Sequence, residues 1–180
     1  SIEKLKHFIS KDALNIDGLG KKVIEKFWDL KFIRFPQDIF DLNFDKIENL
    51  EGWGKLSTSN LKYSIENSKS ITFDKFIYSL GIRHIGQENA KLLSENIKSI
   101  ENLKQIDKNF NFKNLLNIDG IGETQINSLK KFFSNSINRK IINELSKYIK
   151  ILKTVKKIDG KFVNKSFLIT GKLIGISRAE

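Results

Sequence analysis

The chain has 180 residues, enough for one domain or for one domain and part of a second. It contains no cysteine and no apolar run near 18 residues, which excludes disulfides, thiolate metal sites and a membrane-spanning helix within these residues. Its formal net charge of +11 favours a polyanionic partner, but charge alone does not establish one. Lysine supplies 28 of the 32 basic residues, a bias that AT-rich codons also produce.

The two ends of the chain suggest that it is part of something longer. There is no methionine, not even at position 1. The last four residues, Ser177, Arg178, Ala179 and Glu180, have the form of a capping box that opens a helix. No signal-peptide pattern is present. We therefore expect a cytoplasmic fragment of a larger protein.

One short pattern occurs four times along the chain, at residues 16–20, 50–54, 83–86 and 118–122. Each copy is a tight turn of the form Gly-apolar-Gly that leads into a helical pattern. The third copy has His84 where the others have their first glycine. The last glycines of successive copies are 34, 32 and 36 residues apart, so the chain contains an internal repeat.

An amphipathic helical stripe follows every copy of the turn, with apolar residues spaced three and four apart. The stripe residues are Val23, Ile24 and Phe27; Leu61 and Ile65; Ala90, Leu93 and Ile97; and Ile126, Leu129 and Phe133. A similar stripe, Phe73, Phe76, Ile77 and Leu80, precedes the third turn. The pattern predicts a mainly α fold of helix–turn–helix units, which bury their apolar faces against one another.

The pattern changes towards the end of the chain. Ile137, Ile141, Leu145, Tyr148 and Ile149 predict one helix of about 14 residues. Nine basic and two acidic residues follow between 138 and 165. Residues 167–170 predict a buried strand. We therefore expect a helical domain over 1–150, a basic linker over 151–161 and the truncated start of an α/β domain over 162–180.

The repeated turns are candidate phosphate-binding sites. A glycine turn that opens a helix directs several backbone N–H groups at one point, where the helix dipole adds partial positive charge. Four such points in a row favour the DNA backbone as the ligand. The candidate DNA-binding residues are Gly18, Gly20, Lys21, Lys22, Gly52, Gly54, Lys55, His84, Gly86, Gln87, Gly120, Gly122, Thr124 and Gln125.

Each of these residues also has a plainer interpretation. A single Gly-x-Gly serves many turns that bind nothing, and exposed lysines often only face solvent. Trp53 either packs inward or wedges against a sugar, and His84 either contacts phosphate or packs at the surface. A tetratricopeptide repeat has a similar period, but it needs other residues at fixed offsets and no double glycine.

The residues do not form a recognisable catalytic or metal site. Lys157, Ile158, Asp159 and Gly160 match the Lys-x-Asp-Gly motif of nucleotidyltransferases. That lysine needs a folded nucleotide pocket that lowers its pKa, and a basic linker does not supply one. We interpret the match as coincidental and predict neither a catalytic residue nor a bound metal in this chain.

The turns and their helices resemble the helix-hairpin-helix motif, and four in tandem resemble the corresponding domain of bacterial NAD-dependent DNA ligases. Residues 6–10 and 13–20 are similar to the segment that follows the zinc finger of this family. Residues 76–86 are similar to its third hairpin. Residues 167–173, with Ser177 and Arg178, resemble the opening of its BRCT domain.

The resemblance implies a monomeric, cytoplasmic enzyme that seals nicks in duplex DNA during replication and repair. In that family NAD adenylates a lysine, AMP passes to the 5′-phosphate, and magnesium assists joining to the 3′-hydroxyl. The catalytic domains and the structural zinc site would precede Ser1, so the fragment alone should be inactive. This part would grip the backbone without reading sequence, and would associate with the nucleoid when bound to DNA.

Two other classes of function stay open. A helix-hairpin-helix glycosylase or nuclease would need a catalytic aspartate beside a base pocket, whereas this chain shows four equal hairpins and no separate catalytic domain. A non-enzymatic scaffold would use the hairpins to pack against protein, and would show no salt-sensitive affinity for DNA.

Overall fold

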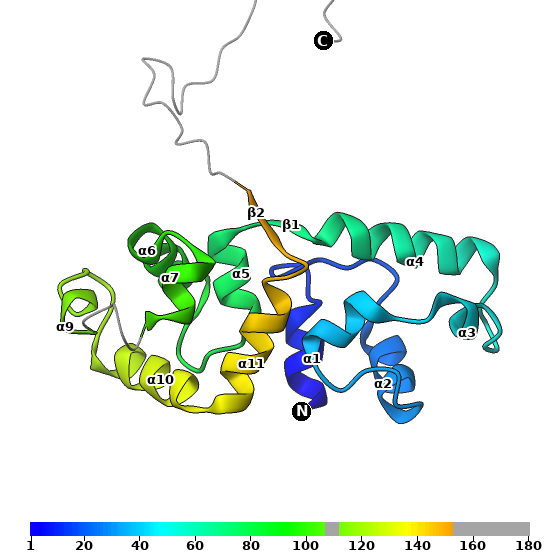
Figure 1. Cartoon of the computed structure of the whole chain (residues 1–180), viewed down its shortest axis with the longest axis horizontal. Helices are drawn as coiled ribbons and strands as arrows, with labels where there is room; N and C mark the ends of the chain where they lie inside the picture. Colours follow the sequence, from blue (N-terminus) through cyan, green and yellow to red (C-terminus); the bar gives the residue numbers. More distant parts are fainter. Residues whose placement is uncertain (107–111, 153–180) are drawn as a thin grey trace, which may run out of the picture.

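The computed structural model describes residues 1–106 and 112–152, and in this part the chain is mainly α-helical, as predicted. Figure 1 shows two groups of helices along the long axis, with α1 and α11 near the middle. The first group is α1 (Ile2–Phe8), α2 (Lys21–Asp29), the 3₁₀ helix η1 (Pro36–Asp41), α3 (Phe44–Glu48) and α4 (Lys55–Ser68). The second is α5 (Phe73–Ser79), α6 (Gln87–Ile97), α7 (Ile100–Lys104), α9 (Phe112–Leu115) and α10 (Glu123–Ser134). The strand β1 (Ser70–Thr72) lies between the groups in sequence; α11 (Ser136–Leu145) and the strand β2 (Lys150–Leu152) follow them.

The predicted apolar stripes form the hydrophobic core. All their members after the four turns are buried in one continuous cluster except Val23, which packs on its edge, and the stripe of α5 joins the same cluster. Burial of each large apolar side chain stabilises the fold by about 1.5–3 kcal/mol. The helices on both sides of every turn are therefore held by the core, and the turn between them has a fixed geometry.

The last predicted helix is shorter than expected. The stripe predicts about 14 residues, but α11 ends at Leu145. The next amides turn back, so that Lys147 N–H donates to the Glu144 carbonyl and Tyr148 N–H to the Leu145 carbonyl, each at 3.0 Å. Tyr148 and Ile149 fit the helical period of α11. They also fit an extended segment that runs from the end of α11 to β2 along the same hydrophobic core. Periodicity alone did not distinguish the two.

That strand pairs with a distant segment. β2 runs parallel to β1, with Ile71 opposite Ile151, and Lys150 N–H donates to the Lys69 carbonyl at 2.7 Å. The first two residues of the expected linker thus lie in β2. The rest of the linker, the Lys157 motif, the strand at 167–170 and the domain expected over 162–180 lie outside the described residues.

Within residues 1–106 and 112–152, every helix is too short or too polar to cross a lipid bilayer.

Candidate nucleic-acid interface

The four repeated turns share one backbone geometry, and we name them hairpins 1 to 4 in chain order (residues 16–20, 50–54, 82–86 and 118–122). In each, the N–H of the fourth residue donates to the carbonyl of the first. The donors Leu19, Trp53, Ile85 and Ile121 lie 3.3, 3.0, 3.1 and 3.0 Å from their acceptors. These are the hydrogen bonds of β-turns, so the predicted repeat is a structural repeat.

The third residue of every hairpin has left-handed backbone geometry. Its φ is +82° at Gly18 and Gly52, +89° at Gly120 and +60° at His84. Glycine adopts this geometry without steric cost, and a positive φ at this position is the mark of a type II turn. His84 therefore stands in the place of a glycine, as the sequence comparison of the four copies predicted, and keeps the same turn.

The second glycine of each hairpin is the N-cap of the following helix. Gly20, Gly54, Gly86 and Gly122 accept the first helical hydrogen bond, at 2.9 to 3.1 Å. Their φ values are all negative, from −69° to −166°, which any residue can adopt. A Cβ built on Gly20, Gly54 or Gly86 would meet no atom within 4 Å. Nothing in the described structure requires glycine at these three positions, and the space in front of them is open.

The hairpins differ in whether the N-cap amide is free. Gly54 N–H donates to Ser57 Oγ at 3.0 Å, and Gly122 N–H donates to Gln125 Oε1 at 3.1 Å. The N–H groups of Gly20 and Gly86 make no hydrogen bond within the part of the chain that the structure describes. Hairpins 1 and 3 thus present one more free donor each than hairpins 2 and 4. The Gln125 side chain accepts this hydrogen bond within its own hairpin, so its Oε1 is already paired.

All fourteen candidate residues lie in the hairpins or in the first turn of the helix that follows. Twelve are exposed, and Gly54 and Gln125 are partly buried. Hairpins 1 and 4 both contain an aspartate, Asp17 and Asp119, but the helix after hairpin 1 starts with Lys21 and Lys22 whereas the helix after hairpin 4 starts with Glu123. The positive potential is therefore not shared equally between the hairpins.

Hairpins 1 and 2 pack on each other as a pair. Lys26 Nζ in α2 donates to the Glu51 carbonyl at 2.9 Å, and Gly18 faces Leu61 in α4. The Trp53 ring lies 5.7 Å from the Phe27 ring, centroid to centroid. Of the two interpretations of Trp53, the structure supports inward packing.

Hairpins 3 and 4 form a second pair through different residues. Asn89 Nδ2 in α6 donates to the Gly120 carbonyl at 2.9 Å, and His84 Nδ1 lies 3.1 Å from Ser128 Oγ in α10. A Cβ on Gly120 would lie 3.0 Å from Leu92 Cδ1, so a side chain there would displace the end of the Leu92 side chain in addition to straining the backbone. The sequence did not identify Asn89 or Ser128 as partners of these turns. Asn89 is 31 residues from Gly120 and Ser128 is 44 residues from His84, and no local pattern links residues so far apart.

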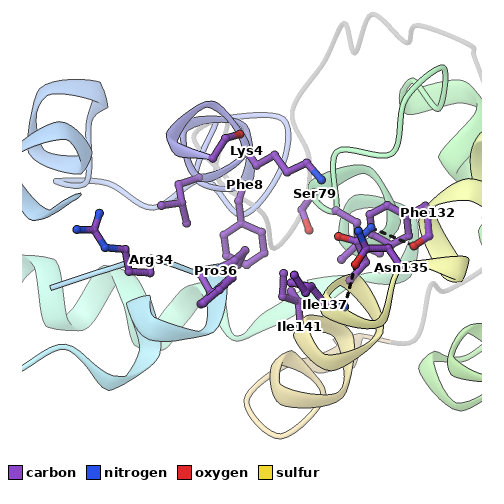
Figure 2. A pocket seen from close by; sticks show the side chains of 14 residues that line it. Lys4, Phe8, Arg34, Pro36, Ser79, Phe132, Asn135, Ile137 and Ile141 are labelled. Carbon is purple, nitrogen blue, oxygen red and sulfur yellow. Dashed lines mark hydrogen bonds between the residues drawn. The ribbon is translucent and has the colours of Figure 1, made fainter. Parts of the chain in front are cut away.

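A separate cavity of about 380 Å³ lies away from the hairpins. Figure 2 shows its lining, which includes Phe8 of α1, Pro36 and Ile141. Asn138 Nδ2 donates to the Phe132 carbonyl at 3.0 Å along one side. No residue of the four hairpins lines it, so this cavity is not part of the candidate interface.

The chain has no cysteine, and its described residues contain no group of three or more His, Asp or Glu arranged to hold a metal ion.

The geometry agrees with what comparison with known proteins finds. Residues 75–142, which contain hairpins 3 and 4, match the family described as the helix-hairpin-helix motif. The chain is 58% identical to a DNA ligase of Pelagibacter ubique over its whole length, which is 27% of that ligase. It is 43% identical to a DNA ligase of Wolbachia from Culex pipiens and 40% identical to one of Fusobacterium nucleatum. These alignments cover 99% and 98% of the chain, and 28% and 26% of the relatives.

Hairpins 1 and 2 lie outside the matched residues but share the backbone geometry of hairpins 3 and 4. The fold and its turns thus define a tandem helix-hairpin-helix protein. The chain is homologous to bacterial DNA ligases, and it spans little more than a quarter of the length of the relatives it matches.

Proposed function

We propose that the four hairpins bind backbone phosphates of duplex DNA and form the DNA-gripping part of a DNA ligase. The observation that carries this proposal is the open space at Gly20, Gly54 and Gly86. Neither φ nor packing explains glycine there, whereas close approach of a phosphate to the backbone does. The second glycine of each hairpin gives a phosphate access to the backbone, while the third residue of the hairpin, with its positive φ, forms the turn.

The chemistry of the hairpins suits phosphate rather than bases. Free N–H groups at the start of a helix carry about half a positive charge together, and lysines at 21, 22 and 55 add full charges beside them. Contacts of this kind fix the position of a protein on the duplex and carry no sequence information. A nick-sealing enzyme needs such a grip, because nicks occur in any sequence.

We further propose that the longer polypeptide is an NAD-dependent ligase that joins a 5′-phosphate to a 3′-hydroxyl at a nick. The names of the relatives support ligation, and the sequence resemblance supports NAD as the cosubstrate. The adenylated lysine, the magnesium site and the structural zinc site belong to other segments. The fragment acts as a monomer and its last residues begin a BRCT domain. Nick sealing by the longer polypeptide with NAD, but not with ATP, tests the choice of cosubstrate.

Binding to DNA tests the role of this chain directly. The full 180-residue chain is titrated onto labelled nicked duplexes of three unrelated sequences, with fluorescence anisotropy as the readout. The proposal predicts saturable binding with affinities that agree within about threefold, because phosphate contacts are sequence-independent. A strong preference for one sequence would contradict backbone grip. No saturable binding would favour a protein-packing scaffold.

A further inference from the structure

α11 and β2 pack between the two helix groups, and we call residues 136–152 the strap. α11 packs against η1, which belongs to the first helix group, and against α7, which belongs to the second. Figure 1 shows α11 between the two groups and β2 crossing to β1. The strap therefore contacts both helix groups without contributing a hairpin itself.

Tyr148 fastens the end of the strap to the first group. Its Oη donates a hydrogen bond of 2.6 Å to Asp41 Oδ2 at the end of η1. Its ring stacks on Phe40, with centroids 5.3 Å apart and planes at 19°. Phe40 in turn meets Phe8 of α1 edge-on at 6.4 Å. One residue thus links the end of the strap to η1 and, through it, to α1.

The region between the groups is not fully filled. The cavity of about 380 Å³ is lined by Phe8 and Pro36 of the first group, by Leu80 and Phe132 of the second, and by Ile141 of the strap (Figure 2). The pocket is open to solvent, because Phe35 and Ile137 in its lining are exposed, and the two groups make fewer contacts with each other there. Contacts outside the pocket, among them those of Tyr148 with η1, therefore contribute more to the orientation of the two groups.

We propose that Tyr148 is a positioning residue, which holds the two hairpin pairs in the one orientation that lets both engage the same duplex. The inference rests on the proposed DNA-binding function. Two linked binding modules gain affinity only where their geometry permits simultaneous contact, and that gain can reach about 10²–10⁴-fold. Fixing the orientation before binding preserves this gain.

The test measures orientation and binding on the same variants. Because the chain has no cysteine, Asn60→Cys on α4 and Asn127→Cys on α10 accept one spin label each, at exposed positions in different groups. The distance distribution between the labels reports orientation, and anisotropy on nicked DNA reports affinity and its salt dependence. Tyr148→Ala removes the hydrogen bond and the stacking, and Tyr148→Phe removes the hydrogen bond alone.

Tyr148→Ala should widen the distance distribution and weaken DNA binding by about three- to tenfold, a part of the gain from linkage. Its salt dependence should be shallower by about one phosphate contact, or 0.9 in the log–log slope. Tyr148→Phe should lie between this variant and the parent. Tyr63→Ala is the matched control, since Tyr63 is 71% exposed on α4 and makes no ring contact with the described residues.

Asp41→Ala provides a second route if Tyr148→Ala does not fold. Asp41 is exposed, and its substitution removes the same hydrogen bond without touching the core. It should reproduce Tyr148→Phe. A distance distribution as narrow as the parent's in both Tyr148→Ala and Asp41→Ala would overturn the proposal, as would unchanged affinity with a widened distribution. If the parent itself shows no salt-dependent DNA binding, the proposed function fails, and the distance distribution still decides whether the strap sets orientation.

Discussion

Asn89 Nδ2 donates a hydrogen bond of 2.9 Å to the carbonyl oxygen of Gly120, and so joins the helix start after hairpin 3 to the turn of hairpin 4. Asn89→Ala leaves that carbonyl without this donor and should lower the free energy of unfolding by about 0.5–1 kcal/mol. Asn127→Ala, at an exposed position in α10, controls for the higher helix propensity of alanine. Urea denaturation measures the free energy of unfolding of both variants. Equal values for Asn89→Ala and Asn127→Ala would show that the hydrogen bond contributes nothing to stability.

The two glycines of hairpin 2 should differ in how substitution affects stability, although a Cβ on either would meet no atom within 4 Å. Gly52 has φ +82°, so Gly52→Ala should lower the free energy of unfolding by about 1–2 kcal/mol. Gly54 is an N-cap with extended backbone, where serine is favourable, so Gly54→Ser should change stability by less than about 0.5 kcal/mol.

The affinity for DNA should show a role of Gly54 that stability does not. Gly54→Ser places a side chain in the space proposed for phosphate, and should weaken binding severalfold at unchanged stability. Anisotropy on nicked duplex, beside a urea titration of each variant, provides the comparison. Full affinity in Gly54→Ser would mean that the open space does not receive a phosphate.

His84 carries the cost of a left-handed residue that is not glycine. His84→Gly relieves that cost while losing the contact with Ser128, and His84→Ala loses the same contact but keeps the cost. The glycine variant should therefore be the more stable of the two by about 1 kcal/mol. Thermal or urea unfolding of the pair measures the difference. A more stable alanine variant would argue against a left-handed backbone at this position.

Tyr148 should titrate later than an ordinary tyrosine. The hydrogen bond to Asp41 raises the pKa of its phenol above the usual 10.0, and desolvation and the negative charges of Asp41, Glu144 and Asp38 act in the same direction. A raised pKa means that this contribution to stability is complete below pH 10 and is lost as pH rises through the folded-state value. Ultraviolet titration should show a phenol that titrates above pH 10 and disappears in Tyr148→Phe. Loss of an early-titrating phenol instead would contradict the assignment.

Much of the architecture could be predicted because it is encoded locally. Each Gly-apolar-Gly turn is specified within five residues, and each apolar stripe within one helix, so helix starts at Lys21, Lys55, Gln87 and Glu123 follow from the pattern. Even the equivalence of His84 with a glycine could be predicted from alignment of the four copies.

What could not be predicted depends on contacts between distant segments. The end of α11 at Leu145 is set by pairing of β2 with β1, which lies 80 residues earlier. The pairing of the hairpins depends on Asn89 and on Trp53 meeting Phe27, and no local pattern specifies such partners. The fourteen candidate DNA-binding residues remain predictions, since local sequence and backbone geometry define their position but not their ligand.

If several hairpins hold DNA phosphates at once, the affinity of the chain for DNA must fall steeply as the salt concentration rises. The full chain is titrated onto a nicked duplex of about 30 base pairs at several salt concentrations, where each neutralised phosphate contributes about 0.9 to the negative log–log slope. The expected slope is about −3 or steeper, equivalent to three or more phosphates. A flat slope without saturable binding would mean that the basic surface of this chain does not grip DNA.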